Sequence, residues 1–260
     1  MSRLDALVGA LKTFYGTLPT PPSDAFQLFV WEMLSVHAVP HKRDAAMAAL
    51  KRHRALTPDA MWRAAQKTLE DSVRLAGPYL EQRLATLRTG VDIFRRAPDL
   101  PTVLRGPLPA ARRALKDLPR MGEGNGYRLL LFAGGHCVLP VDARVSRVAC
   151  RLGYGEKQST FSKTARSVRE AVAAELPERL DAYRRAYIYV DHHGAATCTE
   201  ADPHCHVCPL LKDCPEGKSR SCTRSGHPMA ARSFLLPAAP VKPGISPTGR
   251  LRFSTLPAAW

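Results

Sequence analysis

The residues with the clearest chemistry are four cysteines between Thr197 and Pro215, namely Cys198, Cys205, Cys208 and Cys214, with gaps of six, two and five residues. A thiolate is a strong ligand for soft metals, and four in one short segment can complete a coordination shell. A disulfide pair is one alternative. Zinc is another, although structural zinc sites usually use two C-x2-C pairs and only one occurs here. Irregular spacings of this kind are typical of iron–sulfur clusters.

The pattern C-x6-C-x2-C-x5-C resembles the cluster loop of the endonuclease III family of DNA glycosylases, in the helix-hairpin-helix superfamily. His193-Gly194 and the run Cys208–Leu210 resemble the same family and its adenine-removing relatives. The resemblance covers roughly residues 24–215. It implies one [4Fe-4S] cluster on the four cysteines and double-stranded DNA as the partner. The cluster would be structural, holding Lys212 toward phosphates.

Asp142 is the candidate catalytic residue. An aspartate directly before the segment Ala143–Val148 is typical of a helix N-cap. The same segment resembles the family's Val-Asp-x-x-(apolar)-x-Arg-Val segment, in which the aspartate is catalytic. The resemblance implies that Asp142 stabilises positive charge on the sugar or activates a water, and both roles need an ionised carboxylate. Capping and catalysis are compatible.

The turn after the helix expected at Ala110–Leu118 is a candidate DNA contact, because it would present backbone N–H groups to a phosphate. A plain turn between helices is the alternative. The turn resembles the family hairpin Leu-Pro-Gly-Val-Gly but has Arg120 at the first glycine, where a side chain would crowd DNA or supply its own phosphate contact. The predicted contacts of this hairpin are Leu118, Pro119, Arg120, Met121, Gly122 and Gly124.

The position of the lyase nucleophile holds no amine. Bifunctional family members carry a lysine two residues after the second hairpin glycine, and its amine forms a Schiff base with the sugar. That position is Gly124, and Asp142 follows eighteen residues later, as the family spacing requires. Lys116 and Arg128 are near but off the matching position. We therefore expect weak or no lyase activity, and monofunctional hydrolysis of a base that leaves the stack.

The substrate-facing helix also departs from the family. His37 stands where endonuclease III has a glutamine that fills the gap left by the flipped nucleotide, so His37 would stack there or else lie at the surface. The adenine-removing relatives have a glutamate on this helix. The best register places Trp31 at that position and turns Glu32 to another face, which argues against adenine. Tyr79 falls in the family's wedge loop, where it would stack on a base or pack on the core.

Helices must position these residues, because apolar residues recur at helical spacing and almost nothing alternates with period two. We expect an all-α fold with a DNA cleft between two domains. The predicted parts are a helical barrel of residues 24–135 with the hairpin, a cluster domain of residues 1–23 plus 136–215, and a basic, disordered tail of residues 216–260. The tail composition cannot offset its ordering entropy. It would serve as a DNA-grasping arm or as a dispensable extension.

The charge of the chain favours a polyanionic partner. Lys and Arg outnumber Asp and Glu by 38 to 23, which gives a net charge of +15 and a pI near 9.9. No apolar run reaches the roughly 18 residues of a spanning helix, so a membrane is not expected as a partner. Seven cysteines without an export signal favour reduced thiols. We expect a cytoplasmic monomer, nucleoid-associated if the source is bacterial.

The favoured function is base-excision DNA repair by a glycosylase that hydrolyses the N-glycosidic bond of a damaged or mispaired base. One alternative is a catalytically degenerate binder of damaged or distorted DNA. Another is a zinc-ordered nucleic-acid module. Base release separates the first from the second, and the visible absorption of an iron–sulfur centre would exclude the third.

Overall fold

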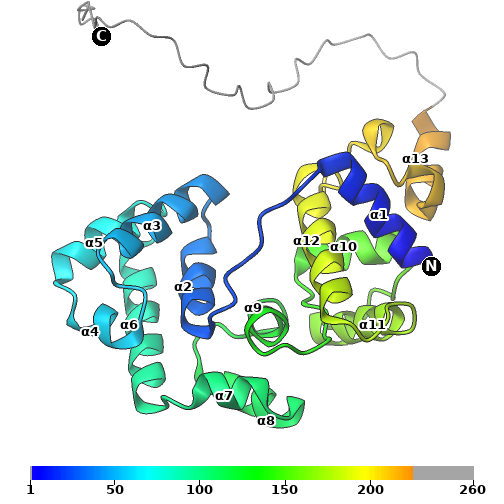
Figure 1. The fold of residues 1–260 in the computed structure, drawn as a ribbon. Helices are drawn as coiled ribbons and strands as arrows, with labels where there is room; N and C mark the ends of the chain where they lie inside the picture. Colours follow the sequence, from blue (N-terminus) through cyan, green and yellow to red (C-terminus); the bar gives the residue numbers. More distant parts are fainter. Residues whose placement is uncertain (1, 225–260) are drawn as a thin grey trace, which may run out of the picture. The chain divides into compact units, whose positions relative to one another are not determined.

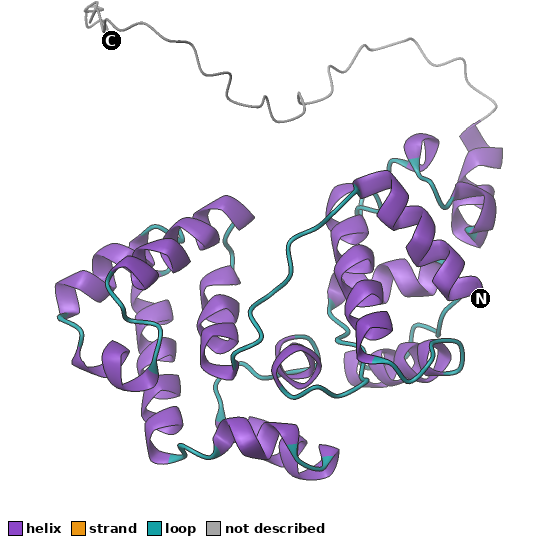
Figure 2. Cartoon of the chain, in the orientation of Figure 1, coloured by secondary structure: helices purple, strands orange, loops and turns teal. Residues whose placement is uncertain are grey.

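A computed structural model of the chain describes residues 2–224, with side chains for residues 2–220, and contains no strand in that range (Figures 1 and 2). The all-α prediction is confirmed. The helices in chain order are α1 (Arg3–Tyr15), α2 (Ala25–Ser35), α3 (Pro40–Arg52), α4 (Pro58–Arg63), α5 (Gln66–Arg74), α6 (Leu80–Arg96), α7 (Leu100–Arg105), α8 (Leu108–Ala114), α9 (Asn125–Arg128), α10 (Ala143–Arg151), α11 (Phe161–Ala173), α12 (Leu180–Ala196) and α13 (Pro215–Arg224). None of the helices described could span a membrane, because none is both long and apolar enough.

Helical periodicity selects the buried faces. In α1 the four residues Leu4, Leu7, Val8 and Leu11 are all buried, as their spacing predicts. Ser2 caps this helix, because its hydroxyl accepts from the Asp5 N–H. In α2 the buried face includes Phe26, Phe29, Val30, Met33 and Leu34, and Glu32 is buried with them.

The helices pack in two groups that share one connecting segment. In the first group α2 contacts α3 and α6, α5 contacts α3 and α6, and α4 contacts α6. In the second, α12 packs on α1 and α10, and α11 packs on α10. The π-helical segment η2 (Leu129–Ala133), which continues α9, contacts both α2 and α12 (Figure 1). The predicted domain boundaries stay a prediction.

The segment η2 is a single wide turn. Its backbone N–H groups reach one residue further back than in an α-helix, as in the hydrogen bond from the Gly134 N–H to the Leu129 carbonyl at 2.9 Å. Such π turns often mark functional sites. Here the wide turn directly follows Arg128, so this arginine sits where both helix groups meet.

The end of the described chain corrects one expectation. Residues Pro215–Arg224 form α13, which packs against α10 and the cysteine loop. We had expected the basic, disordered tail to begin at residue 216. The helix keeps mostly exposed or partly exposed side chains over residues 215–220, with Gly217 buried, and it contacts the folded loop. The rest of the predicted tail, residues 225–260, lies outside the described residues.

Candidate active site and cysteine loop

Asp142 is the N-cap of α10, as its local sequence predicts. Its Oδ1 accepts from the backbone N–H groups of Arg144 and Val145, at 2.9 and 3.0 Å. Its Oδ2 accepts from Nη1 of Arg128 at 3.1 Å. The side chain is 26% exposed, so solvent reaches the carboxylate. Both oxygens are thus fixed in direction while the group remains accessible.

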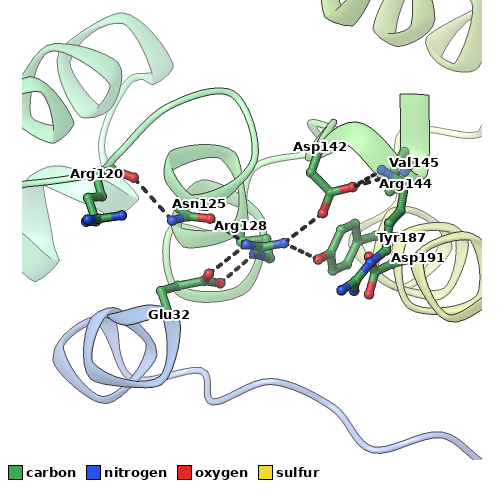
Figure 3. Close-up of polar contacts among 9 residues, drawn as sticks. All are labelled: Glu32, Arg120, Asn125, Arg128, Asp142, Arg144, Val145, Tyr187 and Asp191. Atoms are coloured by element: carbon green, nitrogen blue, oxygen red, sulfur yellow. Dashed lines mark hydrogen bonds and ion pairs between the residues drawn. The ribbon is translucent and has the colours of Figure 1, made fainter. Parts of the chain in front are cut away.

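Arg128 is the centre of the site (Figure 3). Nε and Nη2 donate to the two oxygens of Glu32 at 2.5 and 2.6 Å. Nη2 also donates to Asn125 Oδ1 at 2.5 Å, and Nη1 donates to the Tyr187 hydroxyl at 2.6 Å as well as to Asp142. A guanidinium has five N–H donors, and these five hydrogen bonds use them all. Arg128 therefore links α2, α9, α12 and the start of α10.

The electrostatics keep Arg128 charged. Burial alone would lower the pKa of its guanidinium, but Tyr187, Glu32 and Asp142 around it raise that pKa well above the ordinary value. Burial raises the pKa of Glu32, and contact with Arg128 opposes that shift. Burial and the nearby Asp142 carboxylate raise the pKa of Asp191. Arg128 is thus a permanent cation between the carboxylates of Glu32 and Asp142, while the nearby Asp191 pairs with Arg144 at 3.5 Å.

Gly124 lies directly beside Asp142. A Cβ atom on Gly124 would be 3.2 Å from Cβ of Asp142. Its backbone has the right-handed helical conformation, with φ −85° and ψ −70°, which any residue can adopt. A side chain at position 124 would therefore extend from a point next to the Asp142 side chain. In this chain the cation that contacts Asp142 is Arg128 instead.

The structure corrects the register we proposed for α2. Glu32 has 1% of its side chain exposed and is joined to Asp142 through Arg128, so it does face the site. Trp31 is partly buried and stacks under the guanidinium of Arg43, 4.2 Å from the ring centroid. Sequence reasoning also missed the role of Arg128. The available signal was an acidic residue, Glu32, inside the apolar helix α2 and a basic residue, Arg128, directly before the apolar run Leu129–Ala133.

The hairpin lies between α8 and α9. The side chain of Leu118 is buried, with 3% exposed, so it anchors the hairpin, and any DNA contact of this residue would come from its backbone. Arg120 is exposed and has φ 61°, the left-handed conformation that favours the family's glycine. Its carbonyl accepts from the Asn125 side chain at 3.2 Å. Pro119 and Met121 are partly buried, and Gly122 is exposed.

His37 and Tyr79 are brought together, although 42 positions separate them in the numbering. Their ring centroids are 5.1 Å apart. Both residues have left-handed backbones, with φ 51° and 67°. This conformation costs about 1–2 kcal/mol for a residue with a side chain. Three of the four non-glycine residues with positive φ among those described, His37, Tyr79 and Arg120, are predicted DNA contacts.

The four cysteines of the loop line one small pocket that is partly open to solvent. None of them forms a disulfide. Nη1 of Arg151 approaches Cys198 Sγ at 3.2 Å, and the Gly217 N–H donates to Cys214 Sγ at 3.3 Å. Burial, together with the neighbouring thiols, raises the pKa of Cys208 to about 11. Over the described side chains, no three potential ligands lie close enough to hold a single metal ion.

No protein-family model matches the sequence. The chain is 25% identical over 204 residues to the chloroplastic endonuclease III homolog 2 of Arabidopsis thaliana, covering 77% of this chain and 50% of that one. It is 25% identical over 191 residues to endonuclease III of Treponema pallidum, covering 74% and 83%. The chain thus spans half the length of the Arabidopsis relative.

Two solved structures share the fold. One is a non-covalent endonuclease III–DNA complex, with a TM-score of 0.64, 21% identity and coverage of 84% of this chain and 96% of that one. The other is a thermostable thymine-DNA glycosylase, with a TM-score of 0.64, 17% identity and coverage of 83% and 97%. In sequence the chain is similar to endonuclease III proteins, and it shares the fold of the endonuclease III structure.

Proposed function

We propose that the protein is a base-excision DNA glycosylase that hydrolyses the N-glycosidic bond of a damaged or mispaired base in double-stranded DNA, acting as a monomer. The observation that carries the proposal is the partly exposed carboxylate of Asp142, held by Arg128 at 3.1 Å and placed beside the hairpin residue Gly124. The sequence relatives are endonuclease III proteins, and one structural neighbour is bound to DNA.

The chemistry assigned to Asp142 requires a carboxylate in a fixed direction. When the base departs with the bonding electron pair, positive charge develops on the sugar, and a nearby anion stabilises it. A water then bonds to the anomeric carbon and loses a proton, for which an ionised carboxylate is a suitable acceptor. Three N–H donors hold the Asp142 carboxylate in one direction.

We further propose that the enzyme is monofunctional. A Schiff base needs a neutral amine, and position 124 carries none. Arg128 contacts Asp142 but cannot replace the amine. The pKa of the Arg128 guanidinium is raised, and its five N–H donors are all engaged in hydrogen bonds. Water is then the nucleophile, and strand breaks require a separate step.

We assign a [4Fe-4S] cluster to Cys198, Cys205, Cys208 and Cys214. The donor set fits: four unpaired thiols line one cavity, and N–H groups point at two of the sulfurs. Neighbouring buried thiols resist ionisation unless a positive centre lies between them, which the raised pKa of Cys208 reflects. When bound, the cluster would act structurally, by holding the loop that carries Lys212.

The second candidate function is a binder of damaged or distorted DNA without catalysis. Two observations favour it: Gly124 lacks the lysine, and Arg120 replaces the hairpin glycine. Such a protein would keep the basic surface and the hairpin. It would bind duplexes with an affinity that falls with salt, and it would release no base.

The test is a panel of lesion-bearing and mismatched duplexes incubated with the wild-type protein and with Asp142→Asn. We expect the wild type to release a base, with backbone breaks only after alkali, and the variant to lose about 10²–10⁴-fold in rate while keeping its DNA affinity. The control is Asp181→Asn, because Asp181 is an exposed acid on α12 that pairs with Arg179. This variant should match the wild type. Full-rate release by Asp142→Asn would refute the assigned role. No release from any duplex would favour the binder.

A further inference from the structure

A buried arginine joins the two loops that carry His37 and Tyr79. Arg83 lies in the first turn of α6 and is 3% exposed. Its Nη1 donates to the carbonyl of Gly77 at 3.0 Å and to the carbonyl of Pro78. Its Nη2 donates to the carbonyl of Val36, 47 positions earlier in the chain. Pro78 directly precedes Tyr79, and Val36 directly precedes His37, so one side chain connects both aromatic residues.

Burial of Arg83 deprives its guanidinium of hydration by water. Burial lowers the pKa of its guanidinium. All three acceptors are backbone carbonyls, and Nε has no hydrogen-bond partner among the described residues. Val36 follows the last residue of α2, so its carbonyl lies at the negative end of the helix dipole, which favours a cation. Removing Arg83 would leave the two loops without this connection.

The rings that Arg83 positions face solvent. His37 is exposed and Tyr79 is 52% exposed. Their planes are tilted by 50°, with the centroids 5.1 Å apart. Strained backbones persist where the surroundings enforce them, and they cluster at functional sites. Here both residues have left-handed backbones although neither ring is needed to fill the core.

We propose that Arg83 is a positioning residue that locks His37 and Tyr79 into one two-ring surface, and that this surface stacks on nucleobases exposed where duplex DNA is opened. The inference rests on the proposed function for its ligand. Aromatic side chains bind unstacked bases through their faces, with little sequence preference. Because one guanidinium fixes both loops, the two rings act together and neither binds a base alone.

The experiment is a double-mutant cycle of His37→Ala and Tyr79→Ala, measured in the wild-type and Arg83→Met backgrounds. The probe is a duplex with a stable abasic-site analogue, with 2-aminopurine opposite the analogue to report unstacking. We expect each single variant to lose about tenfold in affinity together with the fluorescence change. The double variant should lose no more than either single one. In Arg83→Met, removing a ring should change nothing further.

Two controls separate positioning from stability and charge. Arg88→Met removes an exposed cation from the same helix and should leave the cycle unchanged. The affinity for an undistorted duplex should stay constant in all ring variants. If circular dichroism shows that Arg83→Met does not fold, the cycle of His37→Ala and Tyr79→Ala in the wild-type background still tests whether the two rings act together. Ring effects that multiply independently, or full ring-dependent binding in folded Arg83→Met, would overturn the proposal.

This readout is separate from catalysis. Because the abasic-site analogue cannot release a base, ring coupling can be measured whether or not the protein is an enzyme. Base release by the wild type with independent rings would refute only the role of Arg83. Coupled rings without base release from any duplex would support Arg83 and refute the glycosylase.

Discussion

At the scale of single residues, Asp142 combines a structural and a proposed catalytic role without conflict. One oxygen caps α10 through two backbone N–H groups, a role that typically contributes about 1 kcal/mol. The other oxygen faces Arg128. The cap fixes the direction in which the second oxygen points. The same side chain can thus start a helix and present a charge to a sugar.

Position 124 gives a gain-of-function prediction. A Gly124→Lys side chain would start 3.2 Å from Cβ of Asp142, on a backbone that accepts it. We expect this variant to form a borohydride-trapped covalent adduct with an abasic-site duplex, measured by gel shift under denaturing conditions. The wild type should form little or none.

The control for this experiment is Gly124→Met, which adds similar bulk without an amine. It should bind the abasic duplex and form no adduct. Strong trapping by the wild type would contradict the proposed lack of lyase activity. Failure of Gly124→Lys to form an adduct, despite bound DNA, would show that position 124 does not face the sugar.

At the scale of elements, the contact between α2 and α6 depends on a glycine. A Cβ atom on Gly90 of α6 would lie 2.1 Å from Cζ of Phe29 in α2. Phe29 is 0% exposed, so its ring has no free space into which to move. This contact orients α2. Helix α2 carries Glu32, and His37 follows its C-terminal end.

We therefore expect Gly90→Ala to lower the free energy of unfolding by about 1–3 kcal/mol, the usual cost of overpacking a core. The measurement is urea denaturation followed by circular dichroism. Gly9→Ala is the matched control, because a Cβ on Gly9 of α1 meets nothing within 4 Å. It should be neutral or stabilise by about 0.5–1 kcal/mol. A Gly90→Ala protein as stable as the wild type would mean that α2 and α6 can separate locally.

At the scale of the whole described chain, the cysteine loop connects segments distant in sequence. Nη2 of Arg3 in α1 donates to the carbonyls of Leu152 and Asp213, at 2.9 and 3.0 Å. Nε of Arg147 in α10 donates to the carbonyl of Cys198 at 2.9 Å. Helix α13 packs on the same loop. The loop thus contacts α1 through Arg3, α10 through Arg147, and α13 directly.

If a cluster holds this loop, loss of the cluster should destabilise the whole second helix group. We expect Cys208→Ser to lose the broad visible absorption and the bound iron. We also expect it to lose more than about 4 kcal/mol of stability, a size that points to a lost metal site or a comparable defect. Cys137→Ser, outside the four-cysteine pattern, should keep all three properties. A wild type with zinc and no iron would contradict the assigned cluster.

Much of the local structure could be predicted from the sequence. The buried face of α1, the cap at Asp142 and the all-α class follow from spacing and residue type, because such signals act over a few residues. Helix α13 was not predicted, because its polar sequence has no apolar periodicity, and its contacts with the folded loop appear only in the tertiary structure. For Glu32, the inferred register placed the side chain on the wrong face.

The sequence by itself determined the thiols available for a cluster, the aspartate at a helix start and the missing amine at Gly124, because these are facts of identity and spacing. Only the tertiary structure decided that the guanidinium of Arg128 would bind both Asp142 and Glu32, which lies 96 positions away. It likewise decided that Arg83 would join the loops of His37 and Tyr79. The physical reason is that a buried charge must find its partners in space, and distance along the chain does not determine them.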